Sequence, residues 1–221
     1  MERFVEQFLN LEIMMAAWPM ILQGFGMTVL ICAVVIPLGL TGGLLAALGS
    51  LSGRRPLRWT VIALVDVFRA FPPLVLLIFI YAGLPFTGLR LSPFAAVAIA
   101  FFLNNSAYYG EIFRAGIQSV GAGQSEAARS TGLTGPQTLA YVVLPQAVRN
   151  VLPDLLSNTV EVVKLTSLAS VVSLGEMLHQ ADLARSVTYN ASPIVLVAGI
   201  YLVLLWPLVR LVSHFERRLA S

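Results

Sequence analysis

The sequence predicts an all-α integral membrane protein with five transmembrane helices, its N-terminus out and its C-terminus in. Hydrophobic residues make up 57% of the 221 positions and charged residues only 11%, and the mean hydropathy is +0.83. This composition leaves too little polar surface to cover a water-soluble core. A helix needs about 20 apolar residues to cross a bilayer, so this length allows about five spans in one domain.

The N-terminal segment, residues 1–18, is expected to lie outside or at the membrane interface, and residues 19–221 to form the core. The charges of residues 1–18 are mainly acidic: Glu2, Glu6 and Glu12 outnumber the single basic residue, Arg3. A secretory signal begins with basic residues, so no cleavable signal is predicted. Apolar side chains recur at helical spacing: Phe4, Phe8, Leu11 and Met15. They favour an amphipathic helix at the interface, and an unanchored tail is the alternative.

The first two spans each contain proline. The first is expected from about Ile21 to Leu48, with Pro37 near its middle. It carries a stripe of small residues against which another helix can pack closely: Gly39, Gly43, Ala46 and Ala47. The second extends roughly from Trp59 to Tyr81, and Pro72 and Pro73 interrupt it.

The other three spans surround one long polar stretch. The third is expected from Phe94 to about Phe113 and becomes polar toward its end. The chain from Arg114 to Pro153 is too polar to cross, and its glycines and prolines divide it into short helices. The fourth span is expected from about Leu155 to Leu174, and the fifth from Ile194 to Val209.

The basic residues predict the orientation. With the C-terminus and the loops after spans one and three in the cytoplasm, nine basic residues lie inside: Arg54, Arg55, Arg58, Arg114, Arg129, Arg149, Arg210, Arg217 and Arg218. Three then lie outside: Arg3, Arg90 and Arg185. The positive-inside rule therefore favours this topology.

The polar stretch contains a predicted pair of short helices, at about residues 120–146. The first runs from Ser125 to Thr131 and ends with Gly132 at its C′ position. The second runs from Pro136 to Leu144, where Pro145 is expected to stop it. Two short helices projecting from a membrane form a rigid knuckle that can transmit motion to a partner. A merely surface-lying amphipathic loop is the alternative.

The first short helix has a composition suited to docking. Ala127 and Ala128 are small enough to let a partner approach closely, and Glu126 and Arg129 can pair with each other or with a partner's charges.

This stretch resembles the EAA loop of ATP-binding-cassette importer permeases. In that pattern E-A-A is followed by three residues, G, nine residues and I-x-L-P. The sequence has Glu126-Ala127-Ala128, Gly132 and Val142-Val143-Leu144-Pro145 at the same spacings, with Val142 in place of isoleucine. The resemblance implies that Glu126, Ala127, Ala128, Arg129, Gly132, Leu144 and Pro145 couple the chain to an ATPase.

Other segments are similar to the polar amino-acid branch of these permeases, the histidine, glutamine, arginine and glutamate type. Arg69-Ala-Phe-Pro72-Pro-Leu-Val is similar to R-G-T-P-L-L-V, and residues 144–149 to L-P-Q-A-x-R. Residues 109–119 contain the pattern E-x-x-R-x-G-I-Q-S, which resembles the segment before the EAA loop. Residues 164–168, Lys-Leu-Thr-Ser-Leu, are close to K-D-T-S-L.

The resemblance implies a type I importer permease of MetI-like fold in the bacterial inner membrane. Residues 1–221 would then be a single transmembrane permease domain. The expected partners are a second permease chain, two ATP-binding subunits, a periplasmic solute-binding protein, membrane lipid and an amino-acid substrate. A net charge of +3 gives no indication of nucleic-acid binding.

The sequence contains no motif for chemistry of its own. A P-loop needs a lysine after a glycine-rich turn, and the only lysine, Lys164, lies inside a span. ATP and Mg²⁺ are therefore expected in the partner ATPase, with no cofactor, metal or catalytic residue in this chain. Cys32 is the single cysteine, which excludes an internal disulfide, and His179 and His214 are far apart.

Charged residues within the spans are the candidates for a substrate pathway, because they are costly in lipid and usually face a wet cavity. Asp66 with Arg69, and Glu161 with Lys164, have the i, i+3 spacing that also allows simple self-pairing. The predicted pathway residues are Ser157, Asn158, Glu161, Lys164, Leu165 and Arg69. Lys164 would bind a carboxylate, and Glu161 or Asn158 an ammonium group.

The function expected is alternating access, in which ATP-driven closure of the partner subunits pushes on the knuckle. Leu165 stands where the family pattern has an acidic residue, so this chain could also be the half of a heterodimer that does not bind substrate. A self-sufficient secondary transporter or channel, and a membrane scaffold, are the alternatives outside this family.

Overall fold

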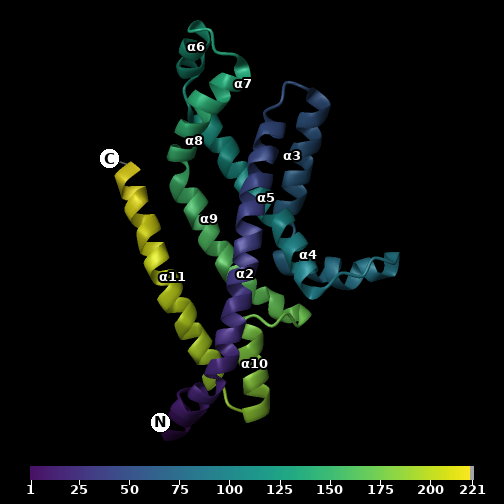
Figure 1. The fold of residues 1–221 in the computed structure, drawn as a ribbon, viewed down its shortest axis with the longest axis vertical. Coiled ribbons are helices and arrows are strands. Elements are labelled where there is room, and N and C mark those ends of the chain that lie inside the picture. Colours follow the sequence, from purple (N-terminus) through teal and green to yellow (C-terminus); the bar gives the residue numbers. More distant parts are fainter. Residues whose placement is uncertain (220–221) are drawn as a thin grey trace. The chain divides into compact units, whose positions relative to one another are not determined.

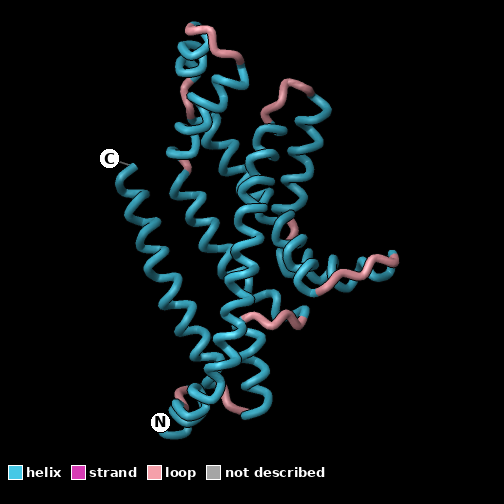
Figure 2. Tube along the Cα trace, viewed as in Figure 1, coloured by secondary structure: helices cyan, strands magenta, loops and turns pink. Residues whose placement is uncertain are grey.

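A computed structural model describes residues 1–219, and within them every regular element is a helix (Figures 1 and 2). The elements are α1 (Glu2–Phe8), α2 (Leu11–Ser50), α3 (Arg55–Ala70), α4 (Pro73–Ile78), η1 (Phe79–Gly83), η2 (Leu84–Thr87), α5 (Pro93–Ser119), α6 (Ala122–Ser130), α7 (Gly135–Thr138), η3 (Leu139–Val143), α8 (Leu144–Asn150), α9 (Leu152–Leu165), η4 (Thr166–Val172), α10 (Met177–Thr188) and α11 (Ser192–Leu219). The predicted all-α class is confirmed.

The chain divides into two compact units, each built from segments distant in the sequence. Unit 1 comprises Met1–Ile36, Pro72–Phe101 and Val160–Arg210. Unit 2 comprises Pro37–Phe71, Phe102–Thr159 and Leu211–Ser221. The helices α2, α5, α9 and α11 each continue from one unit into the other. The single domain expected from the length stays a prediction.

Three helical segments are long and apolar enough to cross a membrane among the described residues: Glu2–Ser50, Leu152–Val172 and Ser192–His214. A fourth is obtained if α3 and the α4–η2 segment, on either side of the break at Pro72, count as one broken span. Helix α5 has 27 residues but falls short of this standard because polar side chains occupy its second half. Three or four of the five expected spans are therefore supported by length and composition.

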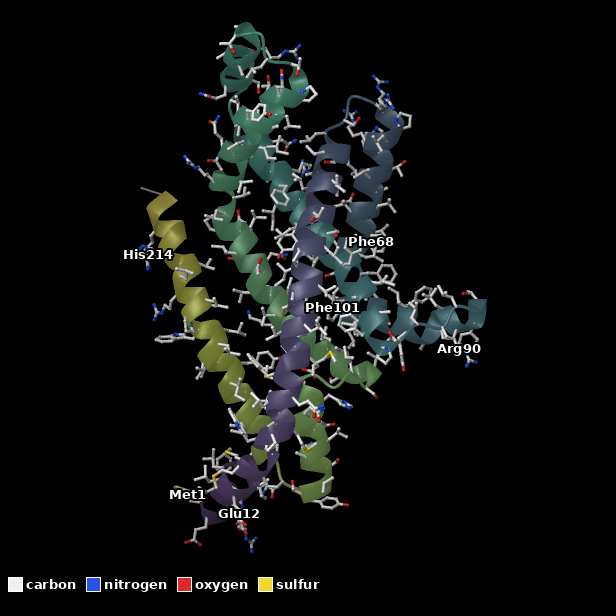
Figure 3. The ribbon with its side chains drawn as sticks, viewed as in Figure 1. Met1, Glu12, Phe68, Arg90, Phe101 and His214 are labelled. Atoms are coloured by element: carbon white, nitrogen blue, oxygen red, sulfur yellow. The ribbon has the colours of Figure 1, made fainter. Side chains whose placement is uncertain are left out.

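Unit 1 has a core where the N-terminal part of α2 lies beside α10 (Figure 1). Its fully buried side chains come from α2, α10 and α11: Ala17, Ile21, Met177, Ala181, Ala184 and Val197. Deeper in the same unit Phe101 has no exposed surface (Figure 3). Burial of apolar side chains between helices is what holds this unit together.

Helix α1 is attached to the turn between α10 and α11. Gln7 Nε2 donates to the Tyr189 carbonyl at 3.1 Å, and Asn190 Nδ2 donates to the Glu6 carbonyl at 2.8 Å. The side chains of Phe4 and Phe8 stack on each other and are exposed. The expected N-terminal helix is divided, because α1 ends at Phe8 while Leu11 and Met15 belong to α2, and its interfacial position stays a prediction. The two hydrogen bonds argue against an unanchored tail.

In unit 2 the small-residue stripe of α2 packs against α5, as expected. A Cβ atom added at Gly43 would lie 2.9 Å from the backbone nitrogen of Gly110, and one at Gly39 would lie 3.3 Å from the Tyr109 ring. Tyr109 is fully buried there, and its hydroxyl and that of Thr159 are 2.8 Å apart. The glycines thus allow two helix backbones to approach to a distance that any side chain would prevent.

Candidate coupling and transport sites

The first knuckle helix forms as the sequence predicts. Helix α6 is capped at Thr131, and Gly132 at C′ has φ 92°. The backbone N–H of Gly132 donates to the Arg129 carbonyl at 3.0 Å, and that of Leu133 to the Ala128 carbonyl at 3.4 Å. Glycine is favoured here because a side chain in the left-handed region meets its own backbone.

The second knuckle helix differs from the prediction, because Pro145 does not stop it. Helix α7 begins with a capping box in which the Thr134 N–H donates to Gln137 Oε1 at 2.9 Å. It widens into the π-helical turn η3 and continues as α8, with Pro145 in the first turn of α8. A proline interrupts one backbone hydrogen bond, and the wider turn absorbs that loss without ending the helix.

The knuckle presents a polar face that no other described element covers. Glu126, Ala127 and Arg129 are exposed, whereas Ala128 is buried. None of the ion pairs recorded among the described residues involves Glu126 or Arg129. Their charges are therefore available to a partner.

The knuckle is fixed to α5 by contacts with α8. Asn150 Nδ2 donates to Ser119 Oγ at 2.8 Å, and a Cβ atom at Gly116 would lie 2.9 Å from the Ala147 carbonyl oxygen. Three residues after Ser119, α6 begins. A force on the knuckle is therefore transmitted to α5 and α8.

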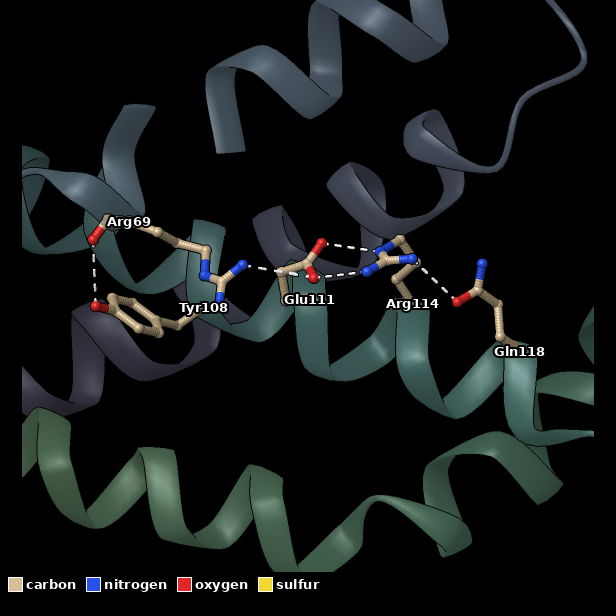
Figure 4. Close-up of polar contacts among 5 residues, drawn as sticks. All are labelled: Arg69, Tyr108, Glu111, Arg114 and Gln118. Atoms are coloured by element: carbon tan, nitrogen blue, oxygen red, sulfur yellow. Dashed lines mark hydrogen bonds and ion pairs between the residues drawn. The ribbon is translucent and has the colours of Figure 1, made fainter. Parts of the chain in front are cut away.

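A chain of charged side chains runs along α5 in unit 2 (Figure 4). Arg114 donates to both carboxylate oxygens of Glu111, at 2.8 and 2.7 Å, and to Gln118 Oε1 at 3.0 Å. Glu111 also pairs with Arg69 of α3 at 3.5 Å, and the Arg69 guanidinium lies 5.7 Å from the centre of the Tyr108 ring. This arrangement links the end of α3 to α5.

Arg69 therefore has a partner that spacing alone did not predict. The possible Asp66–Arg69 pair is not among the ion pairs of the described residues, and Glu111 of another helix takes its place. Asp66 instead lines a cavity of about 490 Å³ together with Arg58, Glu111 and Arg114.

The charged pair on α9 matches its sequence spacing. Lys164 Nζ donates to Glu161 Oε1 at 2.6 Å, and both side chains are about half exposed, at 47% and 59%. Lys164 also lines a cavity of about 260 Å³ in unit 1 with Ser167 and Tyr201. Leu165 is partly buried.

The two other pathway candidates lie earlier on α9, in unit 2. Ser157 and Asn158 are partly buried. The side-chain nitrogen of Asn158 is buried and makes no hydrogen bond. A buried donor without an acceptor is costly unless a ligand or water completes it.

Three polar residues important in the structure were not among the predicted site residues. Asn104, Tyr108 and Glu111 lie on α5 and all contact α3. The signal available was the polar run that ends the third predicted span. Within residues 1–219, no three His, Cys, Asp or Glu side chains lie close enough to hold a metal ion.

Comparison with known proteins agrees with the motif. Residues 39–221 match the family described as the inner membrane component of binding-protein-dependent transport systems. The chain belongs to this family. As such an inner membrane component it is a permease subunit that works with ATPase and solute-binding partners, and ATP hydrolysis belongs to a separate subunit.

Relatives of this permease cover nearly its whole length. It is 37% identical to the probable glutamine ABC transporter permease protein GlnM of Bacillus subtilis, over 96% of this chain and 98% of that one. It is 34% identical to the arginine transport system permease protein ArtQ of the same organism, over 92% and 94%.

Solved structures share its fold. The crystal structure of an amino acid ABC transporter with histidines has a chain with TM-score 0.84 and 37% identity, covering 93% of this permease and 96% of that chain. A chain of the inward-facing MetNI methionine ABC transporter has TM-score 0.71 and 21% identity, covering 91% and 95%. The expected MetI-like fold is confirmed.

Proposed function

We propose that this permease carries a polar amino acid across the bacterial inner membrane by alternating access. The observation that carries the proposal is the half-exposed Glu161–Lys164 pair on α9, which offers both charges that an amino acid needs. Relatives whose names state a solute are named for glutamine, arginine, L-cystine, and glutamate and aspartate. Each of these solutes is a zwitterion at its backbone.

The proposed topology has five spans in one domain, with the N-terminus in the periplasm and the C-terminus in the cytoplasm. In this arrangement α5 is the third span despite its polar half, and the knuckle faces the cytoplasm. The assembly comprises two permease chains, two ATP-binding subunits and one periplasmic solute-binding protein. ATP and Mg²⁺ bind only in the ATP-binding subunits.

The proposed coupling site is the knuckle, with Glu126, Ala127, Arg129 and Gly132 at the contact. Its support is local geometry: the exposed charges on α6 have no partner among the recorded ion pairs, and α6 follows α5 after two residues. Leu144 and Pro145 directly follow the π-helical turn and form the start of α8, so they keep the knuckle continuous with α8.

In the proposed pathway the solute exchanges with the existing ion pair. Lys164 releases Glu161 and binds the carboxylate of the solute, while Glu161 or Asn158 binds its ammonium group. Half-exposed ion pairs are worth little, so exchanging one partner for another is energetically inexpensive. With Leu165 where an acidic residue would stand, a neutral or acidic amino acid suits this site better than a cationic one.

The test is uptake of labelled amino acids by proteoliposomes containing the permease, its ATPase and its binding protein. Lys164→Ala and Glu161→Ala should each lower uptake more than tenfold, while copurification with the ATPase persists. The matched control is Asp182→Ala, which breaks an equally exposed i, i+3 pair with Arg185 at 2.7 Å on α10. Equal uptake by all three variants would contradict the proposed pathway.

A second arm tests coupling against the alternatives. Gly132→Asp and Glu126→Lys should abolish uptake while the chain still inserts into the membrane, because they alter the contact with the ATPase. Uptake that persists without any ATPase would instead indicate a secondary transporter. Wild-type uptake in both variants would indicate that the knuckle is only a surface loop.

A further inference from the structure

The break after α3 leaves two backbone carbonyls without their helical donors. In an α-helix the N–H of residue i donates to the carbonyl of residue i−4. Pro72 and Pro73 have no N–H, so they cannot serve the carbonyls of Phe68 and Arg69. The last backbone bond of α3 runs from the Phe71 N–H to the Val67 carbonyl, at 3.1 Å.

Two side chains of α5 occupy the positions of these missing donors. Asn104 Nδ2 donates to the Phe68 carbonyl at 3.0 Å, and the Tyr108 hydroxyl donates to the Arg69 carbonyl at 3.3 Å. Asn104 is only 1% exposed, so its amide has no access to bulk water as a substitute partner. The two carbonyls that the prolines leave free are thus the two that α5 satisfies.

Glu111 continues the same row of contacts. Asn104, Tyr108 and Glu111 are at positions i, i+4 and i+7 of α5, which lie on one helix face. Glu111 pairs with Arg69 at 3.5 Å, and the Tyr108 ring lies beneath the Arg69 guanidinium (Figure 4). Side chain and backbone of Arg69 are therefore both held by α5.

We infer that Asn104 and Tyr108 are positioning residues that replace the backbone donors missing at Pro72 and Pro73 and thereby fix the broken end of α3 to α5. Irregular backbone persists at membrane depth only where protein groups satisfy it. Because α5 leads into the knuckle, these two bonds transmit its movement to the break. This inference deepens the proposed transport function and, for that last step, rests on it.

A crossed set of variants tests the pairing. Asn104→Leu keeps the size of the side chain and removes the donor, and Tyr108→Phe removes only the hydroxyl. Pro72→Ala frees Phe71 from the extended conformation, ψ 126°, that a following proline favours, and supplies the backbone donor for Phe68. The donor for Arg69 requires Pro72→Ala together with Pro73→Ala, because Pro72 alone keeps Phe71 extended. The measurements are uptake per assembled complex and the melting temperature of the purified complex.

We expect Asn104→Leu to lower uptake about tenfold and Tyr108→Phe about threefold, because the first removes a partly buried hydrogen bond and the second an exposed one. Relative to each proline variant alone, Pro72→Ala should suppress the Asn104→Leu defect, and the double proline variant should suppress the Tyr108→Phe defect. Tyr108→Phe with Pro72→Ala alone, and either defect with Pro73→Ala alone, should show no suppression.

Suppression of the Tyr108→Phe defect by Pro72→Ala alone, or suppression of neither defect by any proline variant, would overturn the inference. If Asn104→Leu does not assemble, the exposed Tyr108 decides the matter through Tyr108→Phe and the double proline variant. The melting temperatures follow the same pairing even if the wild-type permease transports no amino acid. A failure of the proposed function is therefore distinguishable from a failure of this inference.

Discussion

Two pairs of charges with the same spacing behave differently in this permease. Glu161 and Lys164 on α9 pair with each other at 2.6 Å. Asp66 and Arg69 on α3 have the same i, i+3 spacing, but Arg69 pairs with Glu111 of α5. Spacing makes a pair possible, and a competing partner from another helix decides whether it forms.

The difference also separates two roles. Glu111 is 28% exposed and joins two arginines, so its network ties helices together. The α9 pair is half exposed and involves one helix only, so it adds little to stability and remains accessible to a solute. The first arrangement suits structure, and the second suits binding.

The largest effect expected from this comparison is that of Glu111→Gln. Removing the shared carboxylate leaves Arg69 without its ion-pair partner and Arg114 with Asp66 as an acidic neighbour, and should lower the free energy of unfolding by about 2–3 kcal/mol. The matched variant Glu161→Gln should change it by less than about 0.5 kcal/mol. Denaturant titration of both variants in micelles checks this, and similar losses would remove the distinction between the two arrangements.

Glu176 differs from both Glu111 and Glu161, because its carboxyl has no basic partner among the ion pairs of the described residues. In the sequence it lies between the candidate spans Leu152–Val172 and Ser192–His214. It is fully buried and caps α10 by accepting from the backbone N–H groups of Leu178 and His179, at 2.9 and 2.7 Å. Burial raises its pKa to about 7, and the two hydrogen bonds oppose that rise.

The Glu176 carboxyl binds its proton more tightly in the folded state than in the unfolded state. Its protonated form therefore stabilises the fold fully below the unfolded pKa of the carboxyl, and this stabilisation is lost as the pH rises toward 7. We expect the free energy of unfolding to fall by about 1–2 kcal/mol between pH 5 and pH 8. Glu176→Gln should lack this component. Identical pH profiles for the wild type and the variant would contradict this account.

A smaller effect is expected from exchanging the α9 charges. The double variant Glu161→Lys with Lys164→Glu preserves the ion pair, so stability should stay within about 0.5 kcal/mol of wild type. Uptake should nevertheless fall, because the carboxylate of the solute would meet a carboxylate. Normal transport kinetics in this double variant would show that the pair is structural only.

The smallest effect is expected from Asp66→Asn. Asp66 is exposed and forms no recorded ion pair in the described part of the chain, so thermal stability should be nearly unchanged. A loss of stability as large as that of Glu111→Gln would mean that Asp66 competes with Glu111 for Arg69. The contrast between the α3 charges and the α9 pair would then not hold.

The features predicted correctly from the sequence depend on local chemistry. Gly132 ends α6 because only glycine suits its positive φ, and the stripe around Gly43 brings α2 to α5 because a side chain would collide. The motif spacing identified the family, and one position of the motif, Gly132, marks a helix end. Helix α2 begins at Leu11, well before the predicted start at Ile21, because a helix does not stop at the edge of an apolar run, whereas its end at Ser50 is close to the predicted Leu48.

The features that the sequence did not predict depend mainly on contacts between distant segments. The spacing of Asp66 and Arg69 gave no information about Glu111, and the prolines at 72 and 73 gave none about Asn104 and Tyr108. Pro145 looked like a helix stop because the sequence does not reveal the π-helical turn before it. The pathway and coupling residues stay predictions, since their function requires partners that are absent from a single chain.

The π-helical turn Leu139–Val143 has a consequence for how the knuckle tolerates length changes. A π turn accommodates one residue more than an α turn, so deleting Ala140 would restore a regular helix. The wider turn takes up its extra residue within one helical turn, so the deletion would leave α7 and α8 on the same faces as before. A single missing amino acid in this turn would thus preserve the contact surface, whereas one missing from a regular α turn would rotate that surface by about 100°.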